Sequence, residues 1–400
     1  MPDKLKILFL SRWFPCQPDN GSKLRVYHLL RGLAAYHNVT LLSFTDQPIL
    51  EIEKSEFRSI CSEVYTVPWQ EFDPYSFRAR IGFLNLKPRS IFDTFSSEMA
   101  EMIKQIFRNQ SFDLVIASQL SMAAYFPYFG RVPALFEELE LGLYNSHFKN
   151  SANPFYRFQK KLTWVKLRQY LSRNLHNFQA CTVVSSQERE LFINSFPAYK
   201  KLIEVIPNCV KIEDYSNLQS EIVQKRLIFS GSLKYQANYE AMIWFIREVY
   251  PLILKQIPDA HLVVTGDHAN LPLPSLKNVT LAGYVEDIKS LIASSQASVA
   301  PLLSGGGTRL KILEAMAIGT PVVATSKGAE GLDAIDDEHL LIADSSSDFA
   351  NQVIRLLKSN ILRDQLSANG KQFVKEHYNW ESVTPRFLRL VESIIGKGIN

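Results

Sequence analysis

The clearest segment with chemical potential runs from Ser304 to Glu314, with the sequence SGGGTRLKILE. It follows a short apolar run ending at Pro301, and a helical pattern begins near Thr308. Glycine lets the backbone approach a ligand closely, and a helix start presents unpaired N–H groups at its positive dipole end. The residues predicted to bind here are Gly306, Gly307, Thr308, Arg309 and Lys311. The pattern predicts a diphosphate site.

Glu314 lies two turns into the same helical pattern, where its carboxylate would accept hydrogen bonds from ribose hydroxyls. The segment lacks the Gly-Lys-Ser/Thr of a P-loop and is not a clean G-x-G-x-x-G. A plain glycine-rich turn with Thr308 as its helix cap is the structural alternative.

The elements that would position this loop alternate between short apolar runs and amphipathic stretches. The predicted strands are Ile7–Leu10, Val39–Ser43, Leu114–Ala117, Ala134–Phe136, Cys181–Ser185, Leu227–Ser230, His261–Thr265, Val279–Ala282, Ser298–Pro301 and Pro321–Ala324. The predicted helices include Lys23–Tyr36, Glu98–Arg108, Tyr239–Gln256 and Leu310–Ala317. Unbroken apolar strands alternating with helices indicate α/β structure, with parallel sheets covered on both faces.

The alternation restarts near residue 226, after a polar stretch without hydrophobic periodicity. The sequence therefore predicts two doubly wound, Rossmann-like domains facing each other across a cleft. The predicted boundaries are residues 1–210 for the first domain, 211–225 for a linker, 226–378 for the second domain and 379–400 for a helix crossing back to the first.

Composition limits the remaining possibilities. The 400 residues are 46% hydrophobic and 21% charged, with a net charge of +4, which is mild for a nucleic-acid-binding protein. The cysteines Cys16, Cys61, Cys181 and Cys209 form no C-x-x-C pair, so neither a zinc module nor a disulfide framework is expected. Because no segment reaches the roughly 18 apolar residues of a membrane span, we expect a cytoplasmic protein.

The run from Gly307 to Ala324 closely resembles the donor-site signature of GT-B glycosyltransferases of family 4, which are retaining enzymes that use nucleotide sugars. The likeness extends along the chain through Trp13–Pro15, Asp19–Ser22, Arg25, Phe229–Leu233, Gly331-Leu332 and Asn379-Trp380. Asn238 with Trp244-Phe245 resembles a subgroup found in exopolysaccharide clusters. The resemblance is strongest over residues 226–330 and weak over 45–200.

The resemblance implies further donor contacts. They are Gly21 in the glycine loop of the first domain, Lys234 at the diphosphate, and Gly283, Tyr284 and Val285 at the nucleobase. For Lys234 the alternative is a lysine in a solvent-facing loop, and for Tyr284 it is a cap on the edge of the core. A UDP-sugar is favoured over a GDP-sugar.

Two departures from the family pattern concern the active site. Gly306 occupies the place of the first of two signature glutamates, so recognition of the donor sugar must differ. Ser118-Gln119 follows the predicted strand Leu114–Ala117, where many members carry an active-site histidine.

The expected chemistry is transfer of a hexose to a glycan, a lipid-linked molecule or a small hydroxylated acceptor. Arg309 and Lys311 would be catalytic by stabilising charge on the departing phosphate. The chain has no Asp-x-Asp motif, which favours a metal-independent reaction without cofactor. In retaining members the leaving phosphate helps to deprotonate the acceptor, so a separate base is not required.

An acidic cluster, Glu137-Glu138-Leu139-Glu140, follows the predicted strand Ala134–Phe136. Glu138 is the tentative catalytic or acceptor-binding residue, with Glu140 as the other candidate. The alternative is a solvated helix start, where acidic residues are favoured by the helix dipole.

Two other functions remain open at this stage. One is a UDP-sugar 2-epimerase-like enzyme of the same fold. The other is a nucleotide-sugar-binding protein without transfer activity, which Gly306 and Gln119 would permit.

Residues 149–176 carry many basic residues, no acidic residue, and interleaved aromatic residues. A basic helix with aromatics can lie at an anionic membrane surface, so weak peripheral contact at the inner face of the membrane is expected. The alternative is a packed helix of the first domain, with core aromatics and solvated lysines.

Overall fold

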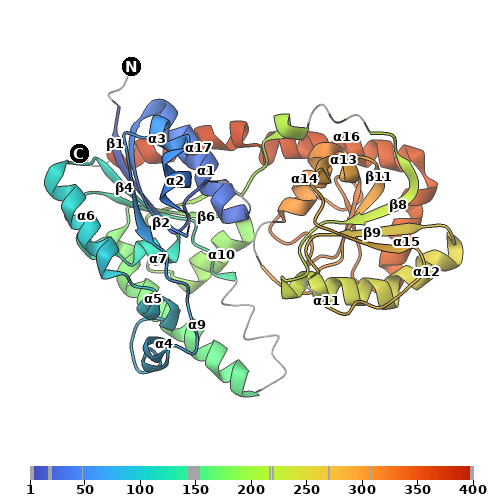
Figure 1. Cartoon of the computed structure of the whole chain (residues 1–400), viewed down its shortest axis with the longest axis horizontal. Coiled ribbons are helices and arrows are strands. Elements are labelled where there is room, and N and C mark those ends of the chain that lie inside the picture. Colours follow the sequence, from blue (N-terminus) through green and yellow to red (C-terminus); the bar gives the residue numbers. More distant parts are fainter. Residues whose placement is uncertain are drawn as a thin grey trace. The chain divides into compact units, whose positions relative to one another are not determined.

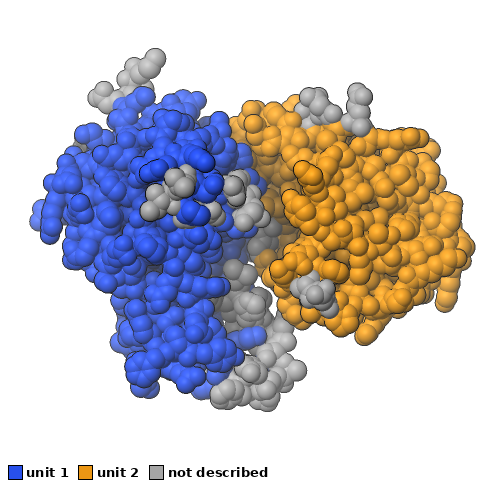
Figure 2. All heavy atoms as spheres, viewed as in Figure 1, with its two compact units in different colours: residues 1–207, 384–400 blue, residues 208–383 orange. Residues whose placement is uncertain are grey.

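The computed structural model describes residues 4–16, 20–46, 48–142, 154–215, 218, 220–268, 271–306 and 309–396. The chain forms two compact units (Figures 1 and 2). Unit 1 comprises Met1–Pro207 and Thr384–Asn400, and unit 2 comprises Asn208–Val383.

Unit 1 is built on a seven-stranded sheet in the order β3-β2-β1-β4-β5-β6-β7, with every strand pair parallel. Its strands are β1 Lys6–Ser11, β2 Asn38–Thr45, β3 Glu63–Pro68, β4 Leu114–Ser118, β5 Ala134–Glu137, β6 Ala180–Val183 and β7 Leu202–Val205. Its helices are α1 Gly21–Tyr36, α2 Ile49–Glu53, α3 Phe57–Ile60, α4 Phe77–Ile81, α5 Arg89–Asp93, α6 Ser97–Asn109, α7 Gln119–Ala123, η1 Phe126–Tyr128, α9 Pro154–Asn174, η2 Leu175–Asn177 and α10 Ser186–Ser195.

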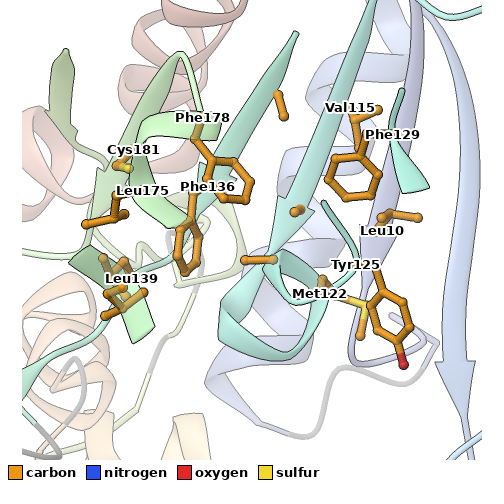
Figure 3. Close-up of a cluster of buried hydrophobic side chains, with 14 of the residues drawn as sticks. Leu10, Val115, Met122, Tyr125, Phe129, Phe136, Leu139, Leu175, Phe178 and Cys181 are labelled. Carbon is orange, nitrogen blue, oxygen red and sulfur yellow. The ribbon is translucent and has the colours of Figure 1, made fainter. Parts of the chain in front are cut away.

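The central strands of unit 1 are buried on both faces, as their unbroken apolar runs predict. Ile7, Leu8, Phe9 and Leu10 of β1 are all inaccessible to solvent. On one side of the sheet, Phe136 of β5 packs against Phe178 with ring centroids 5.2 Å apart (Figure 3). This burial supplies most of the free energy that holds the sheet together.

Unit 2 has a six-stranded parallel sheet in the order β10-β9-β8-β11-β12-β13. Its strands are β8 Val223–Phe229, β9 His261–Thr265, β10 Val279–Gly283, β11 Ser295–Ala300, β12 Val322–Ala324 and β13 Leu341–Ile342. Its helical elements are η3 Ile212–Tyr215, α11 Gln236–Trp244, η4 Phe245–Val249, α12 Tyr250–Gln256, α13 Ile288–Ala293, α14 Leu310–Ile318, α15 Ser346–Lys358 and α16 Asn360–His377. The two doubly wound α/β sheets confirm the predicted fold class.

Strand order reverses once in each sheet, between β1 and β4 in unit 1 and between β8 and β11 in unit 2. At such a switch point the loops after the two strands diverge and leave room for a ligand at the carboxyl ends. The loops after β4 and β11 carry Gln119 and the predicted diphosphate segment. The topology thus brings the predicted site residues of each unit to one edge of its sheet.

The predicted strands omit β3, β7 and β13, all of which lie at or beside a sheet edge. Strand β7 is only partly buried along its length, and β13 is two residues long. Edge strands do not need an apolar side chain at every position, so the apolar runs used for prediction miss them.

The stretch Tyr239–Gln256, predicted as one helix, is interrupted by the π-helical turn η4. Pro251 lies at the start of α12. Proline has no amide hydrogen and its ring crowds the carbonyl four residues earlier, so the helix widens just before it.

The compact units divide at Pro207–Asn208 and Val383–Thr384, not within the predicted linker 211–225. Val210 forms an isolated parallel bridge with Asn379, which ties this part of the chain into unit 2. The predicted linker also contains η3 and the first residues of β8. Helix α17, Trp380–Gly396, enters unit 1 at Thr384, whose methyl carbon would lie 2.4 Å from a Cβ at Gly32.

Candidate functional site: a cation-lined glycine loop and a buried acidic pocket

The loop after β11 is held close to the loop that precedes α11. Gly305 has a φ of 92°, and a Cβ there would lie 2.5 Å from the hydroxyl of Tyr235. The amide of Gly306 donates to the same hydroxyl at 3.4 Å, and the hydroxyl of Ser304 donates to Glu240 at 2.9 Å. Glycine at position 305 is therefore needed for both its backbone conformation and its close approach. Gly307 and Thr308 lie outside the described residues.

Arg309 is buried, and its guanidinium donates to backbone carbonyls. It contacts the carbonyls of Gly305 and Gly306 at 3.2 Å and that of Lys327 at 3.0 Å. Glu330 lies 3.8 Å away at the surface. Helix α14 begins at the next residue. The arrangement makes Arg309 a residue that shapes the glycine loop in addition to supplying positive charge.

Lys311 extends from the first turn of α14 toward the end of β8. Its Nζ donates to Asn238 Oδ1 at 2.8 Å and lies 4.2 Å from the ring centroid of Phe229. A Cβ at Gly231 would lie 2.8 Å from the same nitrogen. Among the described residues, none contributes a carboxylate within ion-pair distance of this ammonium. Burial, and then the charge of Arg309, lower the pKa of Lys311 to about 7.

Glu314 lies one turn further along α14 and accepts a hydrogen bond from the hydroxyl of Tyr215 at 3.4 Å. Burial raises the pKa of Glu314, while the Tyr215 bond and the charges of Lys289 and Lys311 oppose that shift. The ammonium of Lys289 lies 4.7 Å from the ring centroid of Tyr215. A partly buried carboxylate near cations is thus present where the sequence predicts ribose binding.

The remaining predicted donor residues occupy different environments. Lys234 forms an exposed ion pair with Asp267 at 2.6 Å. Gly283 ends β10 with a φ of 65°, and the next residue, Tyr284, is 85% exposed, so it does not cap the core. Val285 is half-buried. In unit 1, Gly21 is the first residue of α1.

Unit 1 holds a second polar cluster where β4 and β5 end. Arg25 of α1 donates through Nε to Glu137 at 2.5 Å and through Nη1 to the carbonyl of Ile206 at 2.8 Å. The hydroxyl of Ser118 donates to the other oxygen of Glu137 at 2.6 Å. Arg25 and Glu137 are fully buried, so this ion pair is a structural element of the sheet edge.

Glu138 and Gln119 lie beside this ion pair, and both have left-handed backbone conformations, with φ of 56° and 71°. Gln119 Nε2 donates to Glu138 Oε2 at 2.7 Å. Burial, and then the charge of Glu137, raise the pKa of Glu138 well above its ordinary value, and Arg25 only partly opposes them. Two strained non-glycine residues in contact point to a functional site. The solvated helix start considered for this cluster is wrong, because Glu137 and Glu138 are both buried.

A pocket of about 260 Å³ opens beside these residues. Glu138, Glu140, Gln119 and Ser121 line it, together with Arg12 and Trp13. The guanidinium of Arg12 lies 4.8 Å from the ring centroid of Trp13 and 4.6 Å from that of Trp69. Buried oxygens of Gln119 and Ser121 have no hydrogen-bond partner among the described residues. The pocket thus offers polar groups to a ligand rich in hydroxyls.

The sequence did not predict several contacts that the structure shows at these sites. Tyr235 contacts the glycine loop, Asn238 and Tyr215 contact Lys311 and Glu314 of α14, and Gln119 contacts Glu138. Helix α11 also contains Gln236, Tyr239 and Glu240, so the polarity of Asn238 does not single it out in the sequence. Tyr215 lies far from Glu314 in sequence and only the tertiary fold brings them together.

Comparison with known families agrees with this geometry. The family model described as "Glycosyltransferase Family 4" matches residues 20–214, and the one described as "Glycosyl transferases group 1" matches residues 224–359. The chain is a glycosyltransferase of the family 4 type. The glycosyltransferase resembles an "Uncharacterized 44.6 kDa protein in cps region" of Klebsiella pneumoniae, with 23% identity over 94% of this chain and 97% of that protein. It is 28% identical to the phosphatidyl-myo-inositol mannosyltransferase of Mycobacterium leprae over 48% of this chain and 54% of that enzyme.

Solved structures confirm the GT-B fold of the glycosyltransferase. Sucrose-phosphate synthase from Thermosynechococcus elongatus superposes with a TM-score of 0.69 at 17% identity, over 98% of this chain and 100% of that one. Anabaena HepE in complex with UDP and glucose gives a TM-score of 0.64 at 15% identity, over 97% and 100%. Within the described residues, no helix has the length and apolar character needed to cross a membrane.

The predicted membrane-contact segment 149–176 contains the whole of α9, and residues 149–153 lie outside the described residues. Trp164, Leu167 and Leu171 are buried in the core of unit 1. Lys166 donates to the carbonyls of Gly82, Phe83 and Asn85, at 3.4, 2.5 and 2.9 Å. One face of α9 therefore packs against the core of unit 1, in agreement with the alternative prediction of a packed helix for this segment.

Proposed function

We propose that this glycosyltransferase transfers a hexose from a UDP-sugar, in preference to a GDP-sugar, with retention of configuration and without a metal ion. The observation that carries the proposal is the partly buried ammonium of Lys311, aligned with the start of α14 beside a glycine loop. Its close partners among the described residues are an amide oxygen and an aromatic ring, and a partly buried cation in such surroundings is suited to an anionic ligand. A diphosphate satisfies that requirement.

The reaction needs stabilisation of the negative charge that develops on the departing phosphate. Lys311 and the free N–H groups at the first turn of α14 supply fixed positive charge there. Arg309 holds the carbonyls of the glycine loop, so that the loop amides are positioned before the donor arrives. Preorganised groups stabilise the transition state without reorganising during the reaction.

Glu314 is proposed to accept hydrogen bonds from the ribose hydroxyls. Tyr215 already donates to one of its oxygens at 3.4 Å, which orients the carboxylate. Gly283, Tyr284 and Val285 are proposed to contact the nucleobase, and Gly306 to lie beside the donor sugar. HepE was solved with UDP and glucose, which supports a uridine donor for a protein of the same fold.

The unit 1 pocket is proposed to bind the acceptor. Glu138 and Gln119 present polar atoms held by strained backbone, and the pocket has room for part of a sugar ring or a similar hydroxylated group. Glu138 is the candidate catalytic residue on this side, and its raised pKa allows it to donate as well as accept a hydrogen bond.

A lipid-linked acceptor at the membrane surface is one form of this proposal. The mycobacterial relative is named for a phospholipid substrate, phosphatidyl-myo-inositol. The exposed basic residues of α9, such as Arg157 and Lys161, are the proposed contacts within residues 149–176.

The test begins with thermal shifts of the full chain against a panel of UDP- and GDP-sugars. The best donor is then incubated with and without acceptors, in the presence of EDTA, while free nucleotide and glycosylated product are measured. Product formation with UDP-sugar in EDTA supports the proposal. A thermal shift without any turnover indicates a binding protein, and conversion of the donor to its 2-epimer indicates the epimerase-like alternative.

A further inference from the structure

Residues 75–87 of unit 1, which include α4, expose an unusual concentration of large apolar side chains. Tyr75 is 77% exposed, Phe77 78%, Ile81 42%, Leu84 90% and Leu86 69%. Single exposed apolar residues are ordinary, but several together mark an interaction surface.

Helix α4 is oriented opposite to a normal surface helix. Its small residue Ala79 is fully buried, whereas Phe77 and Ile81, one turn apart, are exposed. A surface helix usually turns its largest apolar side chains toward the core. The orientation of α4 therefore indicates that Phe77 and Ile81 contact an apolar partner outside this protein.

The surroundings hold this segment in its exposed position. Arg89 donates to the carbonyls of Ala79 and Pro74 at 2.8 and 2.6 Å. Helix α9 passes beside α4 (Figure 1). Its Lys166 donates to the carbonyls of Gly82, Phe83 and Asn85, which follow α4. These hydrogen bonds hold the backbone of residues 74–85 against unit 1. The exposed positions of the apolar side chains are therefore set by the fold.

The charge of this segment is of one sign. Between Asp73 and Asp93 the sequence contains basic residues and no acidic residue. Arg80 and Lys87 are exposed among the apolar side chains. Exposed apolar side chains interspersed with cations are the combination that binds to anionic lipid surfaces.

An adjacent cavity has matching properties. It has a volume of about 630 Å³ and is lined by Leu84 and Leu86 on one side and by Phe126 and Tyr170 on the other, with Lys87 and Arg173 also present. This volume lies within the range of about 300–1,000 Å³ typical of ligand sites. Apolar walls beside cations suit an acyl chain with an anionic headgroup.

We propose that residues 75–87 form the surface through which this glycosyltransferase lies on an anionic lipid bilayer. Phe77, Ile81, Leu84 and Leu86 enter the acyl boundary, and Arg80 and Lys87 lie in the headgroup layer. This inference deepens the lipid-linked form of the proposed function, and it assigns the main contact to α4 and its following loop instead of α9.

The experiment is flotation of the full chain with vesicles, either of phosphatidylcholine or of phosphatidylglycerol and phosphatidylcholine in equal parts, at low and high salt. Wild-type protein is expected to float with the anionic vesicles at low salt. The double variant Phe77→Ser/Leu84→Ser should lower vesicle-bound protein about tenfold or more, since two large apolar side chains leave the bilayer. Arg80→Glu should lower it about fivefold or more.

Matched controls are Ile193→Ser/Ile361→Ser, which changes exposed apolar residues elsewhere, and Lys255→Glu, which reverses a charge in unit 2. Both should bind like wild type. The proposal is overturned if wild-type protein fails to float with anionic vesicles, if salt has no effect, or if the controls lose binding equally. It is also overturned if only Lys161→Glu in α9 abolishes binding, or if Phe77→Ser/Leu84→Ser instead changes the oligomeric state.

Release of UDP from UDP-glucose in vesicle-free solution is measured for the same variants. Normal release with lost flotation separates the membrane surface from catalysis. Absent release in wild type would count against the proposed function while leaving the flotation result intact.

Discussion

The two polar sites of this glycosyltransferase differ in whether a carboxylate neutralises the cation. In unit 1 the buried cation, Arg25, is matched by the buried carboxylate Glu137 at 2.5 Å. In unit 2 the ammonium of Lys311 instead contacts the amide oxygen of Asn238 and the ring of Phe229. The charge of Arg25 is neutralised by Glu137, whereas the charge of Lys311 is not neutralised by an ion pair among the described residues.

This difference matches the ligand proposed for each unit. A neutralised network can position neutral hydroxyl groups without attracting ions, which suits the proposed acceptor. Excess positive charge in a partly buried site is stabilised by an anion, which suits the proposed diphosphate. The predictions below test this contrast, beginning with the change of largest expected effect.

Removing Arg25 should destabilise unit 1 strongly. Arg25→Met leaves Glu137 buried without its cation, and breaking a buried pair in this way costs about 3–5 kcal/mol. Urea unfolding should show the loss. As a control, Arg386→Ala breaks a partly exposed pair with Glu204, which should cost about 1 kcal/mol or less. Equal effects would mean that the Arg25 pair is not a special feature of unit 1.

Removing the ammonium of Lys311 in unit 2 should lower the rate of sugar transfer more than it lowers stability. Lys311→Met is expected to lower kcat by about 10²–10³, because fixed charge at the departing phosphate is lost. The donor KM should change less. Lys234→Met is the comparison variant, since Lys234 is exposed and paired with Asp267. A change confined to KM would limit Lys311 to ground-state binding, and an equal loss with Lys234→Met would show that both lysines contact the diphosphate.

Glu314→Ala should weaken binding of UDP by tenfold or more. Hydrogen bonds to charged groups contribute about 1.5–3 kcal/mol, and the ribose would lose such an acceptor. Titration calorimetry on the folded variant measures the effect, with Glu330→Ala as a surface control. An unchanged dissociation constant would remove Glu314 from the ribose site.

Donor affinity should depend on pH through Lys311. Its pKa in the free protein is lowered to about 7, and an adjacent diphosphate raises the pKa of an ammonium, so binding takes up a proton above this pH. Affinity for UDP-glucose should therefore fall as the pH rises from about 7, by up to about tenfold per unit, and level off below it. Lys311→Arg, which does not titrate, should abolish this slope in calorimetric titrations.

The last prediction concerns Glu138 in unit 1. Because the pKa of Glu138 is raised, the folded protein keeps a proton that the unfolded chain releases, and stability declines as the pH rises through that window. Glu138→Gln removes this decline, so its stability relative to wild type should increase from pH 5 to pH 8, by about 1.4 kcal/mol for each unit of pKa difference removed. A constant difference across that range would show that Glu138 is ionised in the folded protein.

Local patterns in the sequence predicted the fold class and a glycine loop at the start of α14. Fully apolar runs identify strands buried on both faces, so β1, β4 and β9 were predictable, whereas the partly exposed β7 was not. The run of glycines before α14 predicted close approach of the backbone to a ligand, whereas the close approach in the structure is that of Gly305 to the Tyr235 side chain. These features depend on residues near one another in the chain, which is why the sequence contains them.

Tertiary structure decided how the charges are paired. Arg309 and Lys311 are equivalent cations in the sequence, yet one is directed at loop carbonyls and the other at Asn238. The partnership of Arg25 with Glu137 joins residues 112 positions apart. Burial and distance set the pKa of a side chain, and both are properties of the folded chain, so the sequence identifies the charged residues while the fold determines which of them remain available to a ligand.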